Sequence, residues 1–600
     1  MIRRRTPTLI AIMLFTTLSG QLYFSGSSSL RYGESKTGQL YSESILNGNL
    51  TLGNFSGWFQ LEFSNPPELG RTVNGLQKFR LEYINDNSEF KFGDIYEIWG
   101  RGLVLNQYDD QAVDFNNSLT GVSFRNRVGD LLDWGLLAGK GDIWSSEIDI
   151  QNPFFNDRVP NYRRQHRVIG ADMDWLVGPL NLGASYLQSR ERHPYEYSNP
   201  DWSPGEEWTL TDTALVIHRV GGYRAEYLSD RFDIYLEYAD KLTHDFNPDS
   251  VKSYLNGGGR GFYSNLNLYL GAWSVSLDYK KYGYNISEPH TYSAVNNYSG
   301  TIGYQRPPTV IREHPARLLG RITHQVDFED EVGYQIELNG PIIPGNTILI
   351  NYTRASRNEI WSQDKPADSL FWEWIGTDKT GFLPLKNSFA QPFNELFFEV
   401  EGFILYDRIH YRIGMANTGT VLDISTNQVT DSTRNIFYEN QKAFTVPLEI
   451  DYQLGERLGI ELKYEYQRLS KKSRIINTAV SLDTSFSRFP AKYQYNAFLS
   501  LGVSHSPRWS VALLIDASSV LEYGVEQQIV NINTLENLLS NLIDLENRWV
   551  ALELRWNITS SHSLTLTYGS QQGGILCSNG VCRQIEAFED GFKIALTSLF

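Results

Sequence analysis

The chain has 600 residues, a formal net charge of −16 and two cysteines. The acidic balance excludes the basic patches with which proteins bind nucleic acid. Beyond the N-terminus no apolar run reaches the about 18 residues of a spanning helix, which excludes a bundle of transmembrane helices. Aromatic residues make up 13% of the chain, and many Tyr and Trp residues suit the aromatic girdles of a transmembrane β-barrel. The length allows several soluble domains or one large barrel.

The first residues predict a secretory signal peptide. Three arginines at positions 3–5 form a basic region, residues 9–18 an apolar core, and Ser19 and Gly20 a cleavage site of small residues. We therefore assign residues 1–20 to the signal peptide and residues 21–600 to the barrel. Candidate strands follow almost at once, so we expect no plug domain ahead of them of the kind that TonB-dependent transporters carry.

Strands are predicted by apolar residues of period two. In one such stretch Leu564, Leu566 and Tyr568 alternate with three hydroxyl side chains, and 273–280 and 458–467 alternate similarly. Alternation alone fits a soluble sandwich as well as a barrel. The spacing favours the barrel, because tight turns alternate with long connections. The turns are predicted at 177–179, 229–230, 270–271, 407, 455–456 and 506–507, and the connections at 141–166, 189–210, 240–257, 283–330, 356–394, 417–440, 470–492 and 519–545.

The same alternation constrains the number of strands. With 213–220 and 223–228 as separate strands the count is about 25, and the long connections then fall on the wrong side. Merging them into one strand restores the alternation and gives about 24. An even number keeps both chain ends periplasmic. We therefore predict an all-β fold, a single large antiparallel transmembrane barrel with long external loops and short periplasmic turns.

The last residues form an amphipathic strand. Phe592, Ile594, Leu596 and Phe600 lie on one face of it. The strand resembles the closing strand of bacterial outer-membrane barrels, which implies recognition by the barrel assembly machinery and outer-membrane lipid around the wall. The last strand of a soluble sandwich is the alternative interpretation.

Three stretches together resemble an uncharacterised family of outer-membrane β-barrels in Bacteroidota and related bacteria. They are GDIYEIWGRGL at 93–103, continuing to DFNNSLTG at 114–121; PPTVIREH at 307–314, followed by DEVGYQ at 330–335; and GGILCSNGVCR at 573–583. The resemblance implies this fold and location. It implies no reaction and no substrate, because the family has no assigned function.

Residues 94–118 are the most informative segment. Glycines without a regular period precede a cluster of acids, and glycine allows tight turns close to other chain segments. One interpretation is a loop that folds into the lumen as a constriction, with Arg101 facing Asp109, Asp110 and Asp114 across the pore, since opposed charges select ions in pores. The other is a well-packed external loop. Both remain open on the sequence alone.

Cys577 and Cys582 flank a turn-prone tetrapeptide, and we predict a disulfide across this hairpin that contributes roughly 2 kcal/mol. Half of a metal site is the weaker interpretation, because no second cysteine pair exists. The ten histidines lack metal-ligand spacing, and no nucleophile elbow occurs. We predict no catalytic residue, metal or cofactor.

The sequence therefore predicts a porin-like or substrate-specific diffusion channel in the outer membrane of a Gram-negative cell. A barrel of this width encloses more space than its wall side chains can fill. If loops block the lumen, the alternative is a scaffold that serves a periplasmic or surface protein partner, for example in secretion. An outer-membrane enzyme is the second alternative.

Overall fold

The structure is a computed structural model. It describes residues 21–145, 162–198, 209–246, 256–284, 303–322, 324, 326–364, 373–423, 435–477, 486–488, 492–519, 547–579, 581–585 and 587–600. The predicted signal peptide, residues 1–20, lies outside these ranges.

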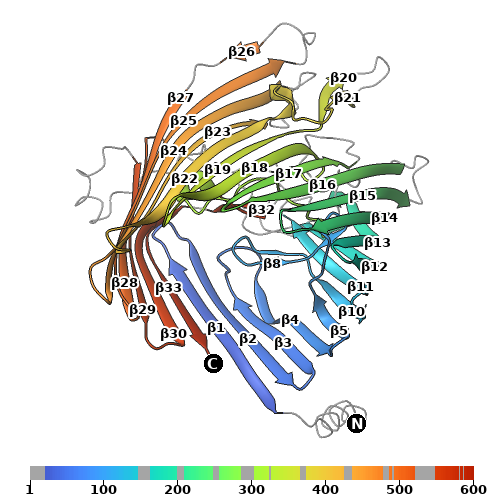
Figure 1. The fold of residues 1–600 in the computed structure, drawn as a ribbon, viewed down its shortest axis with the longest axis horizontal. Helices are drawn as coiled ribbons and strands as arrows, with labels where there is room; N and C mark the ends of the chain where they lie inside the picture. Colours follow the sequence, from blue (N-terminus) through green and yellow to red (C-terminus); the bar gives the residue numbers. More distant parts are fainter. Residues whose placement is uncertain are drawn as a thin grey trace.

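The main sheet is a closed antiparallel barrel (Figure 1). It has 25 strands, of which β26 (Phe486–Arg488) is a short addition to the end of β25 and the other 24 form the ring. The predicted number is confirmed. The ring strands are β1 (Leu22–Glu34), β2 (Leu40–Leu52), β3 (Phe55–Ser64), β4 (Val73–Ile84), β5 (Ser88–Ile95), β10 (Leu119–Val128), β11 (Leu132–Ser145), β12 (Tyr162–Val177), β13 (Leu180–Ser198), β14 (Thr209–Leu228), β15 (Phe232–Phe246), β16 (Asn256–Leu270), β17 (Trp273–Gly283), β18 (Asp330–Ile343), β19 (Asn346–Ser356), β22 (Phe393–Ile404), β23 (Ile409–Asp423), β24 (Asn435–Gln453), β25 (Leu458–Asn477), β27 (Lys492–His505), β28 (Trp509–Ser518), β29 (Asn547–Asn557), β30 (His562–Gln571) and β33 (Phe588–Leu599).

The ring closes between its first and last strands. β33 pairs with β30 on one side and with β1 on the other. The register runs from Ser27 opposite Leu599 to Glu34 opposite Phe592, and Phe600 exchanges two backbone hydrogen bonds with Gly26, at 2.8 and 3.0 Å. The terminal strand therefore completes the hydrogen bonding of the ring.

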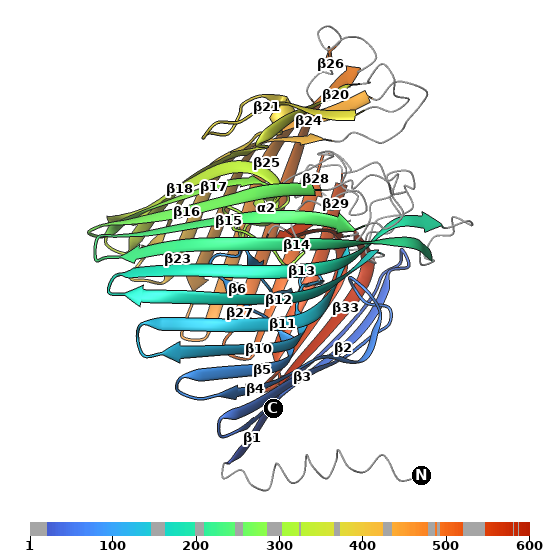
Figure 2. The same cartoon turned by 90° about the vertical axis from the view of Figure 1, so that its right-hand side faces the viewer.

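Tight turns lie together at one end of the barrel (Figure 2). Each predicted short turn joins two consecutive ring strands, and the two segments that were merged form the single strand β14. In outer-membrane barrels the short turns are periplasmic and the long connections external. We use these two names for the ends of the barrel.

Side-chain exposure follows the predicted alternation. In β25, Leu458, Ile460 and Tyr464 are 36–40% exposed on the outside, whereas Glu465 and Gln467 are at most 6% exposed on the inside. Closure leaves no unpaired strand edge, which a bilayer requires. A closed barrel with an apolar outer wall and a polar inner wall is an outer-membrane protein.

Smaller elements lie in the connections. Four two-stranded pieces pair as β6 (Ile98–Trp99) with β7 (Leu105–Asn106), β8 (Asp109–Asp110) with β9 (Phe115–Asn116), β20 (Glu359–Asp364) with β21 (Glu373–Lys379), and β31 (Gly574–Ser578) with β32 (Val581–Ile585). The helical pieces described are α2 (Arg317–Gly320) and η1 (Ser388–Ala390). Within the described ranges, no helix has the length and apolar character to cross a membrane.

Candidate functional site in the barrel lumen

Residues 96–118, which connect β5 to β10, lie inside the ring of strands, where Figure 1 shows β8. The two hairpins β6–β7 and β8–β9 make up most of this inner segment. Gly100 and Gly102 have φ values of +61° and +95° in the turn between β6 and β7. Only glycine adopts this left-handed region without strain, so these glycines allow the tight turn at the tip of the inner segment.

The tip of the inner segment is apolar and packs against the wall. Trp99, Leu103, Val104 and Leu105 are at most 4% exposed. Complete burial of such a side chain contributes roughly 1.5–3 kcal/mol, so the tip is held as part of a packed core. The wall side chains of this cluster come from eight neighbouring strands and are Ile95, Leu119, Leu137, Ile143, Val168, Leu187, Val220, Tyr235, Ala239 and Tyr263.

A wall carboxylate also holds the tip. Glu237 of β15 accepts hydrogen bonds from the backbone N–H of Arg101 at 2.6 Å and of Leu103 at 3.3 Å. The hydroxyl of Tyr235 donates to the same carboxylate at 2.6 Å. Glu237 is 3% exposed, so it satisfies backbone donors that would otherwise be buried without partners.

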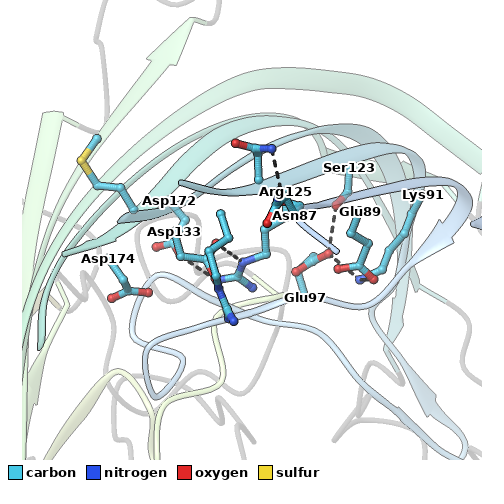
Figure 3. A network of polar contacts seen from close by, with 12 residues as sticks. Asn87, Glu89, Lys91, Glu97, Ser123, Arg125, Asp133, Asp172 and Asp174 are labelled. Carbon is cyan, nitrogen blue, oxygen red and sulfur yellow. Dashed lines mark hydrogen bonds and ion pairs between the residues drawn. The ribbon is translucent and has the colours of Figure 1, made fainter. Parts of the chain in front are cut away.

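The start of the inner segment is tied to the wall by an ion pair (Figure 3). Lys91 Nζ lies 3.0 Å from Glu97 Oε1, and Ser123 Oγ donates to the same oxygen at 2.9 Å. Lys91 and Ser123 belong to β5 and β10, the strands that the segment connects. The segment is thereby anchored where it leaves the wall.

A belt of paired charges continues along the wall on the periplasmic side of the tip (Figure 3). Arg125 Nε donates to Asp133 Oδ1 at 2.8 Å. Arg224 binds Asp172 at 2.8 Å and Asp174 at 2.6 Å. These five residues, on β10, β11, β12 and β14, are called the charge belt. A cavity of about 270 Å³ lies between the charge belt and the tip.

The structure separates Arg101 from the acids that the sequence placed opposite it. The Arg101 guanidinium lies 5.2 Å from the ring centroid of Tyr235. Asp109 instead pairs with Lys78 of β4, with Nζ and Oδ2 2.7 Å apart. Lys78 is 5% exposed and Asp109 is 26% exposed, so the pair lies at the edge of lumen water. Within the described part of the chain, the positively charged partner of Asp109 is therefore Lys78.

The other two predicted acids have local roles. Asp110 Oδ1 accepts the backbone N–H of Ala112 at 3.0 Å, in the turn between β8 and β9. Asp114 has a φ of +46° and lines a cavity on the external side of the segment. The structure thus distributes Asp109, Asp110 and Asp114 along the inner segment.

A second stretch of chain also enters the lumen. Residues 303–322, from the connection between β17 and β18, lie against the inner segment. Backbone oxygens of Tyr304 and Arg306 accept from Asn106 N and Nδ2, both at 2.8 Å. Gln305 Nε2 donates to the Leu103 carbonyl at 2.7 Å. We call residues 303–322 the crossing segment.

The crossing segment ends on the opposite wall. Glu465 of β25 accepts the backbone N–H of Arg317 at 2.8 Å and of Leu318 at 2.7 Å. Asp516 of β28 binds Arg321 Nη1 at 3.0 Å and Arg317 Nε at 3.3 Å. In Figure 1, β11–β16 and β25–β28 lie on opposite sides of the ring. The two segments together therefore span the lumen.

The three stretches that carry the family resemblance meet in this region. Residues 93–121 include the inner segment, and residues 307–314 belong to the crossing segment. The third stretch, 573–583, contributes Asn579, whose backbone N–H donates to Glu313 Oε1 at 2.8 Å. In its hairpin the backbone register places Cys577 opposite Cys582. The predicted disulfide remains a prediction.

Two larger cavities lie along β3 and β4, one on each side of the Lys78–Asp109 pair. The external cavity has a volume of about 440 Å³ and is lined by Glu62, Gln77 and Asp114, among others. The periplasmic cavity has a volume of about 520 Å³ and is lined by Trp58 and Arg80, among others. Along β4, Lys78 stands between Gln77 and Arg80, so the ion pair separates the two cavities.

Sequence reasoning missed the wall residues of the site. Lys78, Glu237, Glu465 and Asp516 are single charged residues at inward positions of ring strands. Their only sequence signal is a charge on the polar face of an alternating strand, and most inward charges share it. Nothing in the sequence indicates which of them face an inward-folded segment.

Several solved structures are similar to the chain. They include the copper transporter OprC (10% identity, 97% of this chain and 81% of that chain covered, TM-score 0.43). The FrpB iron transporter from Neisseria meningitidis is 9% identical, with 97% of this chain and 83% of that chain covered and a TM-score of 0.42. The P pilus usher (PapC) translocation pore is 8% identical, with 96% of this chain and 99% of that chain covered and a TM-score of 0.38.

Among curated proteins, none matches the chain. One family profile matches residues 19–600. The chain therefore belongs to the family described as "Family of unknown function (DUF6029)".

Proposed function

We propose that the protein is a porin-like diffusion channel whose passage is narrowed by the inner and crossing segments. One observation carries the proposal: cavities of about 440 and 520 Å³ lie on the two sides of the inner segment, next to the same strands. A segment that served only to fill the barrel would not need water-accessible space on both sides. The narrowest part of the proposed path is the Lys78–Asp109 pair.

The chemistry of this path suits small hydrophilic solutes. The wall alternates acids, bases and amides, and several charges have a partner of opposite sign within 3 Å, as in Lys78–Asp109, Arg125–Asp133 and Arg80–Glu82. Charged side chains that line a constriction help to select what passes through a pore. In this proposal the inner segment supplies one side of the constriction and β4 supplies the other.

A plugged scaffold is the second candidate, and one observation favours it. Leu103 and Leu105 have no exposed surface, and both segments are bound to the wall through buried carboxylates. A lumen sealed in this way would serve a surface or secretion partner instead of a solute. We also propose that the family is found in Bacteroidota and related bacteria, as the sequence resemblance implies.

Single-channel recording in planar bilayers distinguishes the two candidates. The wild-type protein should show a small stable conductance. Replacing residues 99–110 with a short glycine-serine linker should raise it, and replacing residues 305–321 should do so independently. Heat-modifiable migration on gels controls for folding. Absence of conductance in all three proteins would favour the scaffold.

A further inference from the structure

The periplasmic cavity has a composition that the proposed channel function does not explain. Its volume of about 520 Å³ lies within the range of small-molecule sites, about 300–1,000 Å³. The wall contributes Trp58 and Arg80, and the inner segment contributes Tyr96 and Tyr108. Three aromatic side chains therefore line one cavity from two separate parts of the chain.

These aromatic side chains are neutral. Burial raises the pKa of the Tyr96 phenol well above its ordinary value, and the charge of Asp109 raises it further. Burial likewise raises the pKa of Tyr108. Both phenols therefore keep their protons at any physiological pH. Aromatic rings of this kind present flat apolar surface together with a polar edge.

The charged groups of the cavity are neutralised in pairs. Arg80 Nε lies 2.6 Å from Glu82 Oε1, and Ser56 Oγ donates to Glu82 Oε2 at 3.0 Å. Asp109 has Lys78 as its partner at 2.7 Å. The cavity thus offers directional donors and acceptors with little net charge. Such a lining gives no electrostatic preference to a free cation or anion.

Uncharged polar groups complete the lining on the periplasmic side. Asn49 and Thr51 of β2 are exposed inward-facing residues that line the cavity. An amide and a hydroxyl each supply both donors and acceptors, which is what vicinal hydroxyl groups of a solute require. Apolar ring faces and neutral polar groups therefore lie within one cavity.

We infer that the periplasmic cavity is a binding site for a neutral saccharide that passes through the channel. The apolar face of a sugar ring would stack on Trp58, and its hydroxyl groups would bond Asn49, Thr51 and the Arg80–Glu82 pair. This inference rests on the proposed function, because the site lies directly on the periplasmic side of the Lys78–Asp109 constriction.

Maltose, a neutral disaccharide, is the probe. Added to the periplasmic side of single channels, it should block the current in a concentration-dependent manner. Trp58→Ala should raise the half-blocking concentration at least about tenfold, which equals about 1.4 kcal/mol. Trp58→Phe, which keeps a ring face, should raise it less. Trp175→Ala is the matched control, because Trp175 is 47% exposed on the outer wall, and it should leave the block unchanged.

Calorimetric titration of the detergent-solubilised protein with maltose measures binding without conduction. Binding that Trp58→Ala weakens supports the site, even if the protein does not conduct and the channel proposal fails. A conducting protein that neither binds maltose nor is blocked by it overturns the saccharide site and leaves the channel proposal intact. The saccharide site is also overturned if glycine blocks the current and maltose does not. The same holds if maltose blocks the wild type and Trp58→Ala equally.

Discussion

The ion pair between Lys78 and Asp109 gives the sharpest test of the proposed path. Lys78→Met removes the cation and keeps the length of the side chain, and it leaves the carboxylate of Asp109 uncompensated at the constriction. A unit charge about 5 Å from a permeating ion contributes about 0.8 kcal/mol in water, or about 0.5 kcal/mol after screening in 0.1 M salt. A cation gains this energy and an anion loses it. The K⁺ to Cl⁻ permeability ratio should therefore rise about 5- to 15-fold.

Reversal potentials in a salt gradient across a planar bilayer measure this ratio. Asp109→Asn should lower the ratio by a similar factor, since it leaves Lys78 uncompensated. The double variant, Lys78→Met with Asp109→Asn, should return close to the wild-type value and controls for changes of shape. If all four proteins showed the same selectivity, the ion pair would lie away from the ion path and the reasoning would be wrong.

Three further predictions concern the barrel itself. Leu566→Arg should destabilise the folded protein by about 2–4 kcal/mol in a urea titration in lipid vesicles, because Leu566 faces lipid. Thr565 faces the lumen, so Thr565→Arg should change the stability less in the same titration. Deleting residues 592–600 should abolish heat-modifiable barrel in outer-membrane fractions, because β30 and β1 would then have unpaired edges; normal accumulation of folded protein would contradict this. Mass spectrometry of unreduced envelope protein should show Cys577 linked to Cys582, and two free thiols would contradict the disulfide.

The wall of the barrel could be predicted because its physics is local. Each strand must present apolar side chains to lipid at every second position, so stretches such as 458–467 carry the pattern in the sequence. The difference between tight turns and long connections is also local, which is why the strand count and the merged strand β14 were predicted correctly. Neither feature depends on contacts between distant residues.

The lumen could not be predicted in the same way. The glycines at 100 and 102 indicate a tight turn, but the cluster in which Trp99 and Leu103 are buried is assembled from eight wall strands. Nearness in sequence predicts Arg101 as the partner of Asp109. In the structure the partner is Lys78 on β4, which is brought close by the pairing of β4 with β5 and by the path of the inner segment after β5.

The two lumen segments are held by the same device. Glu237 and Glu465, on β15 and β25, each accept two backbone N–H groups from a segment. A hydrogen bond contributes roughly 0.5–1.5 kcal/mol, and a buried carboxyl group without partners is costly. Moving either segment would break both bonds of its carboxylate and expose its buried apolar residues to water. This anchoring favours a static constriction, in which the charges and aromatic rings along the path decide what passes and the segments do not need to open.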